Sequence, residues 1–313
     1  VPGEVIGRLE AVRSARFEVV PHLAPLSAER VATGLSVEPA EATVEARDPV
    51  LAQVTAVRAS ARIGADPLLI QGPGGNTSIK DAEVMWIKAS GKELADSMAS
   101  DIFVAVDRKA AAAEARGAGD GTCKATVLDP EIRLRPSIET TFHAILDWRV
   151  VAHTHSVAVL SHVISPAGRR VAREKLADLD PVFVPYAKPG RPLTQAILDR
   201  IRPETRLILL ENHGLIVCGN TTAETEGLMQ RVEGKLHRDP IDVTSTAPAS
   251  EPLPGFTWAA EENWLAQDPE ALSRVTAGSF YPDHVVFLGP ALPTADNENA
   301  PPVVLAPGAG VQV

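Results

Sequence analysis

The chain has 313 residues, of which 45% are hydrophobic and 22% are charged, so it can bury a large core and form one sizeable domain with appendages. A formal net charge of −10 and a pI near 5.3 oppose binding to nucleic acids and to anionic membranes. No apolar run is long enough to span a bilayer, and we expect a cytoplasmic protein. The two cysteines, Cys123 and Cys218, are expected to be reduced thiols.

Three parts follow one another along the chain. Residues 1–47 carry no motif and are expected to form an accessory arm. Residues 48–240 are expected to form the catalytic domain, which begins with an amphipathic helix over 48–64. Residues 241–313 start with a linker rich in Pro, Ser, Thr and Ala, followed by an expected helix over 259–275 and a strand over 284–288, and read as a small C-terminal appendage.

Strands and helices are interspersed within the expected catalytic domain. Apolar runs typical of strands lie at 84–90, 102–106, 149–155, 182–186, 206–210 and 214–218. Helical patterns lie between them at 109–116, 137–146, 193–201 and 222–236. This mixture predicts an α/β fold.

Three histidines fall where strands are expected. His153 and His155 are two residues apart, so on a strand both side chains project to one face. An isolated pair of this kind is more often one buried core histidine and a chance neighbour. His213, however, interrupts an apolar run, and a polar group at such a place needs a reason. Three neutral imidazoles that leave one coordination position open predict a catalytic zinc site, with cobalt, manganese and nickel as alternatives.

A carboxylate precedes this group in the sequence. Glu139 and His143 are four residues apart on an expected helix, so they share a face, with Ser137 expected as the N-cap. Glu139 could act as a general acid and base on a metal-polarised substrate. The alternative is a surface glutamate beside a core histidine.

Glycines and small polar residues cluster over residues 71–91. Asn76, Thr77, Ser90 and the adjacent amides could hold an anion, with Lys80 or Lys88 supplying positive charge. The pattern matches neither a Walker loop nor a dinucleotide fingerprint, so a glycine-rich turn before a hairpin is an equal alternative.

In this order, the segments GGNTSIK, WIKASG, LDP, PSIET and HTH resemble the class II aldolase/adducin family over about residues 50–240. These segments are similar in sequence to the aldolase part of bifunctional rhamnulose-phosphate aldolase/short-chain dehydrogenase proteins. The resemblance implies a three-layer α/β/α sandwich around a largely antiparallel sheet, and a homotetramer with active sites at subunit interfaces. It also implies a metal held by His153, His155 and His213, with Glu139 as the catalytic acid and base.

The resemblance also implies an anchor for a substrate phosphate, and four residues match its positions: Asn76, Ser90, Gly91 and Ser137. Two departures concern the same region. Ile138 replaces a serine of the sugar-phosphate aldolases, and Lys88 stands where they carry a neutral residue. The proton-donating tyrosine of fuculose-phosphate aldolase has no clear counterpart. Tyr186 or Tyr281 could take its place, with a packing role as the alternative. His284 could reach the site if the C-terminal part folds back, with a capped surface histidine as the alternative.

We therefore expect a lyase of carbohydrate metabolism. It would make or cleave a C–C bond in a ketose, ketose phosphate or related hydroxy-carbonyl compound through a metal-bound enediolate. One alternative is a metal-dependent epimerase or decarboxylase of sugar or sugar-acid phosphates. Glu139 favours the aldolase, because the epimerases tend to carry Asp there. The other alternative is a non-catalytic adducin-like interaction module. Such a module lacks the three histidines, so their presence in this chain argues against it.

Overall fold

The computed structural model describes residues 13–17, 42–46, 48–281, 283–294 and 303–313. Its contacts divide the chain into one compact unit that ends at Leu236 and a second unit that begins at His237. Most of the expected arm over residues 1–47 lies outside the described residues; within the described part, β1 (Arg13–Phe17) pairs antiparallel with β2 (Ala42–Ala46). Among the described helices, none has both the length and the apolar character that a membrane crossing requires.

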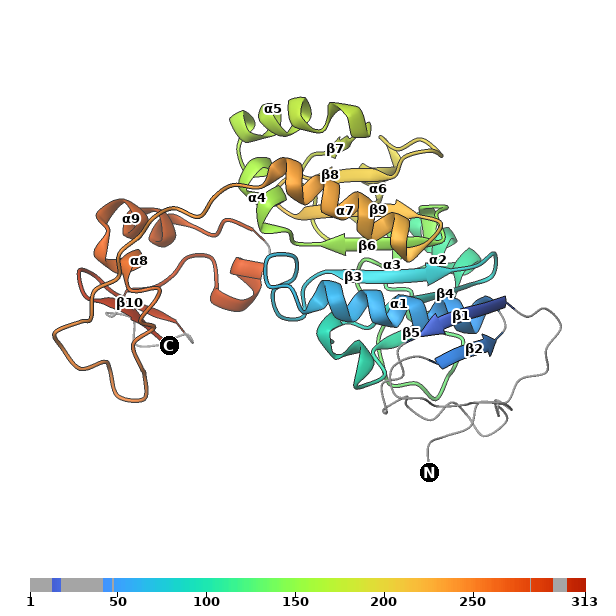
Figure 1. Cartoon of the computed structure of the whole chain (residues 1–313), viewed down its shortest axis with the longest axis horizontal. Coiled ribbons are helices and arrows are strands. Elements are labelled where there is room, and N and C mark those ends of the chain that lie inside the picture. Colours follow the sequence, from blue (N-terminus) through green and yellow to red (C-terminus); the bar gives the residue numbers. More distant parts are fainter. Residues whose placement is uncertain (1–12, 18–41, 47, 282, 295–302) are drawn as a thin grey trace. The chain divides into compact units, whose positions relative to one another are not determined.

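A seven-stranded sheet forms the centre of the first unit, in the order β5-β4-β3-β6-β9-β8-β7 (Figure 1). All neighbouring strands are antiparallel except β7 and β8. The apolar runs expected as strands form six of the seven, whereas β3 had been expected only as a glycine-rich turn. The strands are β3 (Asn76–Lys80), β4 (Val84–Lys88), β5 (Phe103–Asp107), β6 (Val150–Thr154), β7 (Val182–Val184), β8 (Leu207–Leu210) and β9 (Gly214–Gly219).

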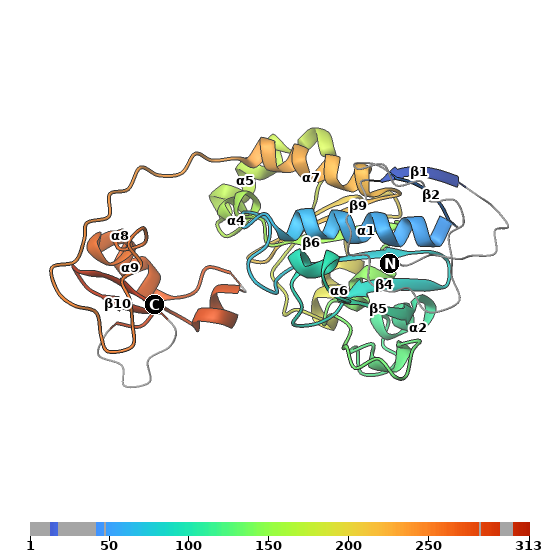
Figure 2. The same cartoon turned by 60° about the horizontal axis from the view of Figure 1, so that its bottom comes forward.

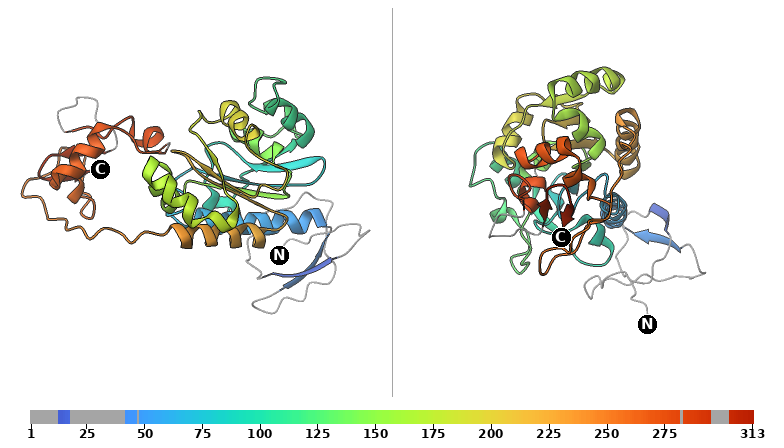
Figure 3. Two further views of the ribbon diagram at one scale, coloured as in Figure 1. Left: turned by 90° about the horizontal axis from the view of Figure 1, so that it is seen from above. Right: turned by 90° about the vertical axis from the view of Figure 1, so that its left-hand side faces the viewer.

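Helices cover both faces of this sheet, so the unit has three layers (Figure 3). One face carries α1 (Asp48–Gly64) and α7 (Thr222–Leu236), which run side by side (Figure 2), with α4 (Val157–Val163) and α5 (Pro166–Lys175) against α7. The opposite face carries α2 (Arg108–Ala115), α3 (Thr140–Ile145) and α6 (Arg191–Leu198). Short 3-10 turns complete the unit: η1 (Leu94–Met98), η2 (Lys124–Thr126) and η3 (Ala177–Leu179). The expected three-layer sandwich with a largely antiparallel sheet is confirmed.

Two expectations for the second unit were wrong. The helix expected over 259–275 is divided into α8 (Trp264–Gln267) and α9 (Pro269–Ala277), because Asp268 is extended and Pro269 cannot continue the ladder of helical hydrogen bonds. The strand expected over 284–288 is a π-helical turn, η4 (His284–Leu288); a short apolar run does not reveal its period. A two-stranded sheet of β10 (Val304–Ala306) and β11 (Gly310–Gln312) completes this unit.

Strand β3 carries polar side chains on one face, although all five of its residues are buried. Asn76, Ser78 and Lys80 alternate along the strand and bond to α3, whereas Ile79 packs against α1 on the other face. The ammonium group of Lys80 donates to the main-chain oxygen of His143 at 2.5 Å. Burial lowers the pKa of Lys80 to about 7, because the low-dielectric interior penalises the charged form.

Lys80 should therefore make the stability of the fold depend on pH. Between pH 7 and the ordinary lysine pKa, the unfolded chain holds a proton here that the folded chain releases, so this residue's contribution to stability rises with pH. Lys80→Met should remove that slope. Urea unfolding between pH 7 and pH 10 would measure this. The free energy of unfolding of Lys80→Met should fall relative to that of the wild type as the pH rises, by up to ~1.4 kcal/mol per pH unit.

Lys109→Met is the matched control, since Lys109 is an exposed residue of α2. Equal pH slopes for wild type and Lys80→Met would contradict a buried, weakly basic Lys80.

Candidate metal centre

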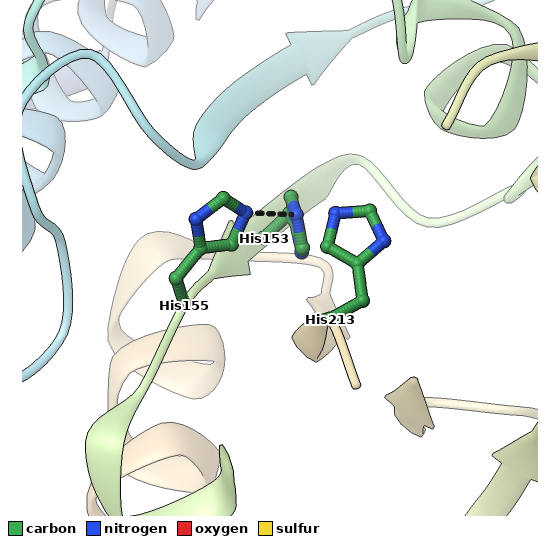
Figure 4. Close-up of side chains that lie close together, drawn as sticks. All are labelled: His153, His155 and His213. Atoms are coloured by element: carbon green, nitrogen blue, oxygen red, sulfur yellow. Dashed lines mark hydrogen bonds between the residues drawn. The ribbon is translucent and has the colours of Figure 1, made fainter. Parts of the chain in front are cut away.

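Three imidazole rings converge at the end of β6 and in the turn that leads into β9 (Figure 4). The pairing of β3 with β6 places His153 opposite Asn76, and His155 follows two residues later on the same side. The Nε2 atoms of His153 and His155 are 3.2 Å apart. One nitrogen from each of the three rings, His213 included, lies within 4.8 Å of the others, and all three residues are buried. The structure thus brings together the three histidines singled out in the sequence.

The position of His213 depends on a tight turn between β8 and β9. Asn212 has a φ of 56° and Gly214 a φ of 152°. A Cβ atom on Gly214 would lie 2.2 Å from the main-chain oxygen of Thr154, so only glycine allows the turn to approach β6 this closely. The polar interruption seen in the sequence is therefore a turn that presents His213 to the two histidines of β6.

The protonation of the rings suits metal binding. Burial lowers the pKa of His213 to about 3, so its imidazole is neutral near pH 7. In His153, Nδ1 donates to the main-chain oxygen of Leu215 at 2.9 Å, which leaves a lone pair on Nε2 of the neutral ring. That Nε2 atom lies 3.4 Å from Oε2 of Glu139.

Glu139 completes the group from the N-terminus of α3. Its Oε1 atom is 3.3 Å from Nε2 of His213 but makes no hydrogen bond, and Nδ1 of His213 also lacks a hydrogen-bond partner. Buried polar atoms without a hydrogen-bond partner are costly, and a cation bound beside them would lower that cost. The donor set of neutral nitrogens with a nearby carboxylate therefore fits a divalent metal.

The start of α3 differs from the sequence expectation. Glu139, rather than Ser137, is the N-cap residue, with φ and ψ of −100° and 5°. Ser137 lies two residues earlier, and its hydroxyl accepts a hydrogen bond from the main-chain N–H of Glu139 at 3.2 Å. The carboxylate of Glu139 therefore lies at the N-terminus of α3, ahead of the first turn of this helix.

Competing influences act on the pKa of Glu139. Burial is the largest and raises it, but His153, His213, the Asn76 amide and His155 together lower the pKa below its ordinary value. Asn76 contributes through its Nδ2 group, which donates to Oε2 of Glu139 at 2.8 Å and to the Ser137 hydroxyl at 3.2 Å. Glu139 is therefore an ionised carboxylate near pH 7.

His143 lies behind Asn76 and away from the other three histidines. It is fully buried, bonds to Oδ1 of Asn76 through Nε2, and stacks on Phe142 with ring centroids 4.6 Å apart. Ser78 lies 2.7 Å from its Nδ1 atom. The contacts of His143 with Ser78 and Lys80 were missed in the sequence, where the alternation of polar residues in NTSIK was the available signal.

Residues expected to hold an anion are distributed unevenly around this group. An antiparallel bridge between Ala89 and Pro136 brings the segment of Ser90 against the segment that leads to Ser137, and the main-chain N–H of Ser90 donates to the main-chain oxygen of Arg135 at 2.9 Å. Gly91 has a φ of 73° and open space around it. The hydroxyl of Ser137 accepts from both Asn76 and Glu139, so its own proton is available to a third group.

Two further anion candidates are placed differently. Thr77 lies on the opposite face of β3, where its hydroxyl bonds to Ser60 of α1 at 2.6 Å, so it does not share a face with Asn76. The ammonium group of Lys88 is buried and donates to the main-chain oxygens of Pro73 and Lys92, at 2.7 and 2.5 Å. Lys88 therefore ties together the two loops that flank Ser90.

Two further candidates, Tyr186 and His284, lie in different parts of the chain. Tyr186 follows β7 and is 60% exposed. His284 belongs to the second unit, where it is buried near Phe280 and Tyr281.

Comparison with known proteins identifies a family for most of the first unit. Residues 56–236 match the model of the class II aldolase and adducin N-terminal domain. The chain is 33% identical over 179 residues to YuxG of Bacillus subtilis (strain 168), an uncharacterized oxidoreductase, and the match covers 51% of this chain and 25% of that protein. The chain therefore spans only a quarter of the length of this relative.

The chain is also similar to solved structures. The N-terminal class II aldolase domain of a conserved protein from Thermoplasma acidophilum is 27% identical, with a TM-score of 0.51, over 58% of this chain and 90% of that chain. L-fuculose-1-phosphate aldolase from Thermus thermophilus is 17% identical, with a TM-score of 0.40, over 59% of this chain and 93% of that chain. The fold and the residues matched define a class II aldolase-type domain. This chain belongs to the class II aldolase and adducin family.

The three histidines should be needed for metal binding. We expect the purified protein to take up about one Zn²⁺ per chain. His153→Ala and His213→Ala should each weaken the affinity for Zn²⁺ by more than 100-fold, because substitutions of residues that only support a metal ligand typically weaken it by roughly 10- to 100-fold. Competition with a chromogenic chelator would measure the affinities. His237→Ala is the matched control, because His237 is exposed. Unchanged affinity in both ligand variants would contradict the site.

Gly214 should be intolerant of any side chain. Gly214→Ala should lower the free energy of unfolding by about 2 kcal/mol or more, because the added methyl meets the main chain of β6 and the residue takes a φ that disfavours alanine. Gly227→Ala is the control: Gly227 lies in α7 with open space around its Cα, so alanine there should stabilise by about 0.5–1 kcal/mol. Denaturant unfolding of both variants would test this, and equal stabilities would refute it.

Proposed function

We propose that the first unit is a metal-dependent aldolase that makes or cleaves a C–C bond beside the carbonyl of a ketose, ketose phosphate or related hydroxy-carbonyl compound. The observation that carries this proposal is the position of the Glu139 carboxylate, 3.3 and 3.4 Å from two of the three buried imidazoles. Members of the family include divalent-metal-dependent aldolases that act on small sugar-type substrates and often form oligomers.

His153, His155 and His213 would hold the metal. Zinc is our first choice, because neutral imidazole donors suit it, with Co²⁺, Mn²⁺ and Ni²⁺ as alternatives. A divalent cation there would supply Lewis-acid polarisation of the substrate carbonyl and of the hydroxyl next to it. The burial of the three rings excludes water from this face of the substrate and strengthens each electrostatic contact.

Glu139 would transfer the proton. As an ionised carboxylate it removes a proton from the carbon next to the carbonyl when a C–C bond is made. In the direction of cleavage, the hydroxyl group that becomes the aldehyde oxygen releases its proton to solvent. Glu139, protonated from solvent, donates a proton to the carbon that loses its bond to the departing aldehyde.

The other end of the substrate would meet Ser90, Gly91 and Ser137. The free proton of the Ser137 hydroxyl and the open backbone at Gly91 can bind an anionic or hydroxylated group. Ile138, which is 58% exposed, follows Ser137 directly in the chain, and its side chain lies against Gly190.

We also propose that the chain has three parts with different roles. Residues 48–240 would form the catalytic domain, residues 1–47 an accessory arm, and residues 241–313 a linker and appendage. A homotetramer, as is common in the family, is the assembly we expect. An epimerase or decarboxylase would use the same carbonyl chemistry, so product analysis must separate these reactions.

Glu139→Gln should lower turnover strongly while leaving the metal in place. The amide keeps the shape of the side chain but cannot accept a proton, so we expect kcat to fall by about 10²–10⁴-fold at an unchanged zinc content. Metal-loaded protein would be incubated with ketose phosphates, free ketoses and hydroxy-keto acids, with aldehyde, carbon dioxide and epimerised sugar all measured.

Glu211→Gln serves as the control, because Glu211 lies two residues from His213 but pairs with Arg169. Release of carbon dioxide without aldehyde, or an epimer without cleavage, would replace the aldolase with one of its alternatives. Full turnover by Glu139→Gln with metal bound would remove Glu139 from the mechanism.

A further inference from the structure

His143 is a buried imidazole that the proposed reaction does not use. It lies within α3, four residues after Glu139, and has no solvent exposure. Three side chains of one face of β3 bond to it: Asn76 to Nε2, Ser78 to Nδ1 and Lys80 to its main-chain oxygen. A buried residue with a partner at each polar atom is held in one orientation.

The contacts of Asn76 determine the state of this ring. The Nδ2 group of Asn76 donates both its protons, to Glu139 and to Ser137, so its Oδ1 atom is the acceptor that faces His143. Nε2 of His143 must therefore carry a proton. In the neutral ring Nδ1 then has a lone pair, and it accepts from the hydroxyl of Ser78 at 2.7 Å.

The opposite orientation of the Asn76 amide would be unfavourable. It would direct Oδ1 at the carboxylate of Glu139, so that two acceptors would meet in a buried site, and it would leave the amide protons against the Nε2–H of His143. The carboxylate of Glu139 thus requires the donor end of the amide, and His143, as the donor to Oδ1, holds the amide in that orientation.

Lys80 secures the backbone from which His143 projects. The main-chain oxygen of His143 lies in the last turn of α3, where carbonyl groups lack helical partners, and the ammonium group of Lys80 binds it. Burial, and after it the charge of Lys80, holds the pKa of His143 well below its ordinary value. Ser78 and Lys80 therefore hold both the ring and the main chain of His143.

We propose that His143, held by Ser78 and Lys80, is a positioning residue that fixes the amide of Asn76 and through it the carboxylate of Glu139. The role of Glu139 in this chain rests on the proposed function, whereas the orientation of Asn76 rests on the contacts alone. His143 itself neither contacts the substrate nor exchanges a proton with it.

Two substitutions of His143 separate positioning from simple packing. Glutamine reaches as far as Nε2 of an imidazole and can still donate to Asn76, whereas asparagine reaches only as far as Nδ1 and can bond only to Ser78. We expect His143→Asn to lower kcat by about 10- to 100-fold with little change in KM, and His143→Gln to retain most of the activity. Ser78→Ala, which removes one contact and little volume, should have a smaller effect in the same direction.

A second readout does not depend on the reaction. In the metal-free protein, the side-chain NH₂ signals of Asn76, assigned by their loss in Asn76→Leu, should be protected from exchange and well resolved by ¹H–¹⁵N NMR. His143→Asn should broaden or shift them, while His143→Gln should preserve them. In the Co²⁺-loaded protein, the visible absorption spectrum should change in His143→Asn and stay close to wild type in His143→Gln.

The outcomes distinguish the two proposals. If no substrate is turned over but the NMR and Co²⁺ readouts follow the expected order, the aldolase proposal fails and the positioning role stands. If His143→Gln and His143→Asn lose activity equally while both remain folded, or if the Asn76 signals are unchanged in His143→Asn, the positioning role is refuted. If both His143 variants unfold, the same signals in Ser78→Ala decide: unchanged signals refute the role, and shifted signals support it.

Discussion

The ionised carboxylate of Glu139, buried against three imidazoles, is the constraint to which the surrounding structure responds. A charge with almost no access to water is costly unless nearby dipoles and cations compensate for it. Asn76 donates to this carboxylate, Ser137 accepts from the main chain of the same residue, and the rings of His153 and His213 flank it. The same cost explains why β3, although it is buried, carries polar side chains toward α3.

The two faces of β3 therefore have different tasks. On one face Thr77 and Ile79 pack against α1 and help to hold the layers together. On the other, Asn76 and Ser78 join the metal centre to the interior of α3. One short strand thus contributes both to the core and to the site, and a shift of its register by one residue would exchange the two faces.

Much of the fold could be predicted from the sequence because its strands are long apolar runs and its helices have clear periodicity. The helices at 48–64 and 222–236 were predicted with the bounds that the structure shows. Short elements were harder. Strand β3 lacks an apolar pattern because its alternate residues are polar, and the run at 284–288 was too short to distinguish a strand from a helical turn.

The candidate site could be predicted in part. His153 and His155 share a face in any strand, so their proximity follows from local geometry. The approach of His213 and Glu139 depends on long-range pairing, for which the resemblance to a known family was the guide. Thr77 shows the limit of sequence adjacency: it stands next to Asn76 in the chain and on the other side of the sheet. The partners of His143 depend on how α3 packs against β3, which spacing along the chain does not reveal.

Strand β6, which carries His153, is approached closely by glycine from both neighbouring strands. A side chain on Gly75 would meet the main-chain oxygen of His153 at 2.7 Å, and one on Gly214 would meet that of Thr154 at 2.2 Å. These positions leave no room for variation, whereas Ile138 and Gly91 border open space. A lineage that adopts a new substrate can therefore vary residues such as Ile138 and Gly91 while β6 stays fixed. Substrate specificity can then evolve separately from the underlying chemistry.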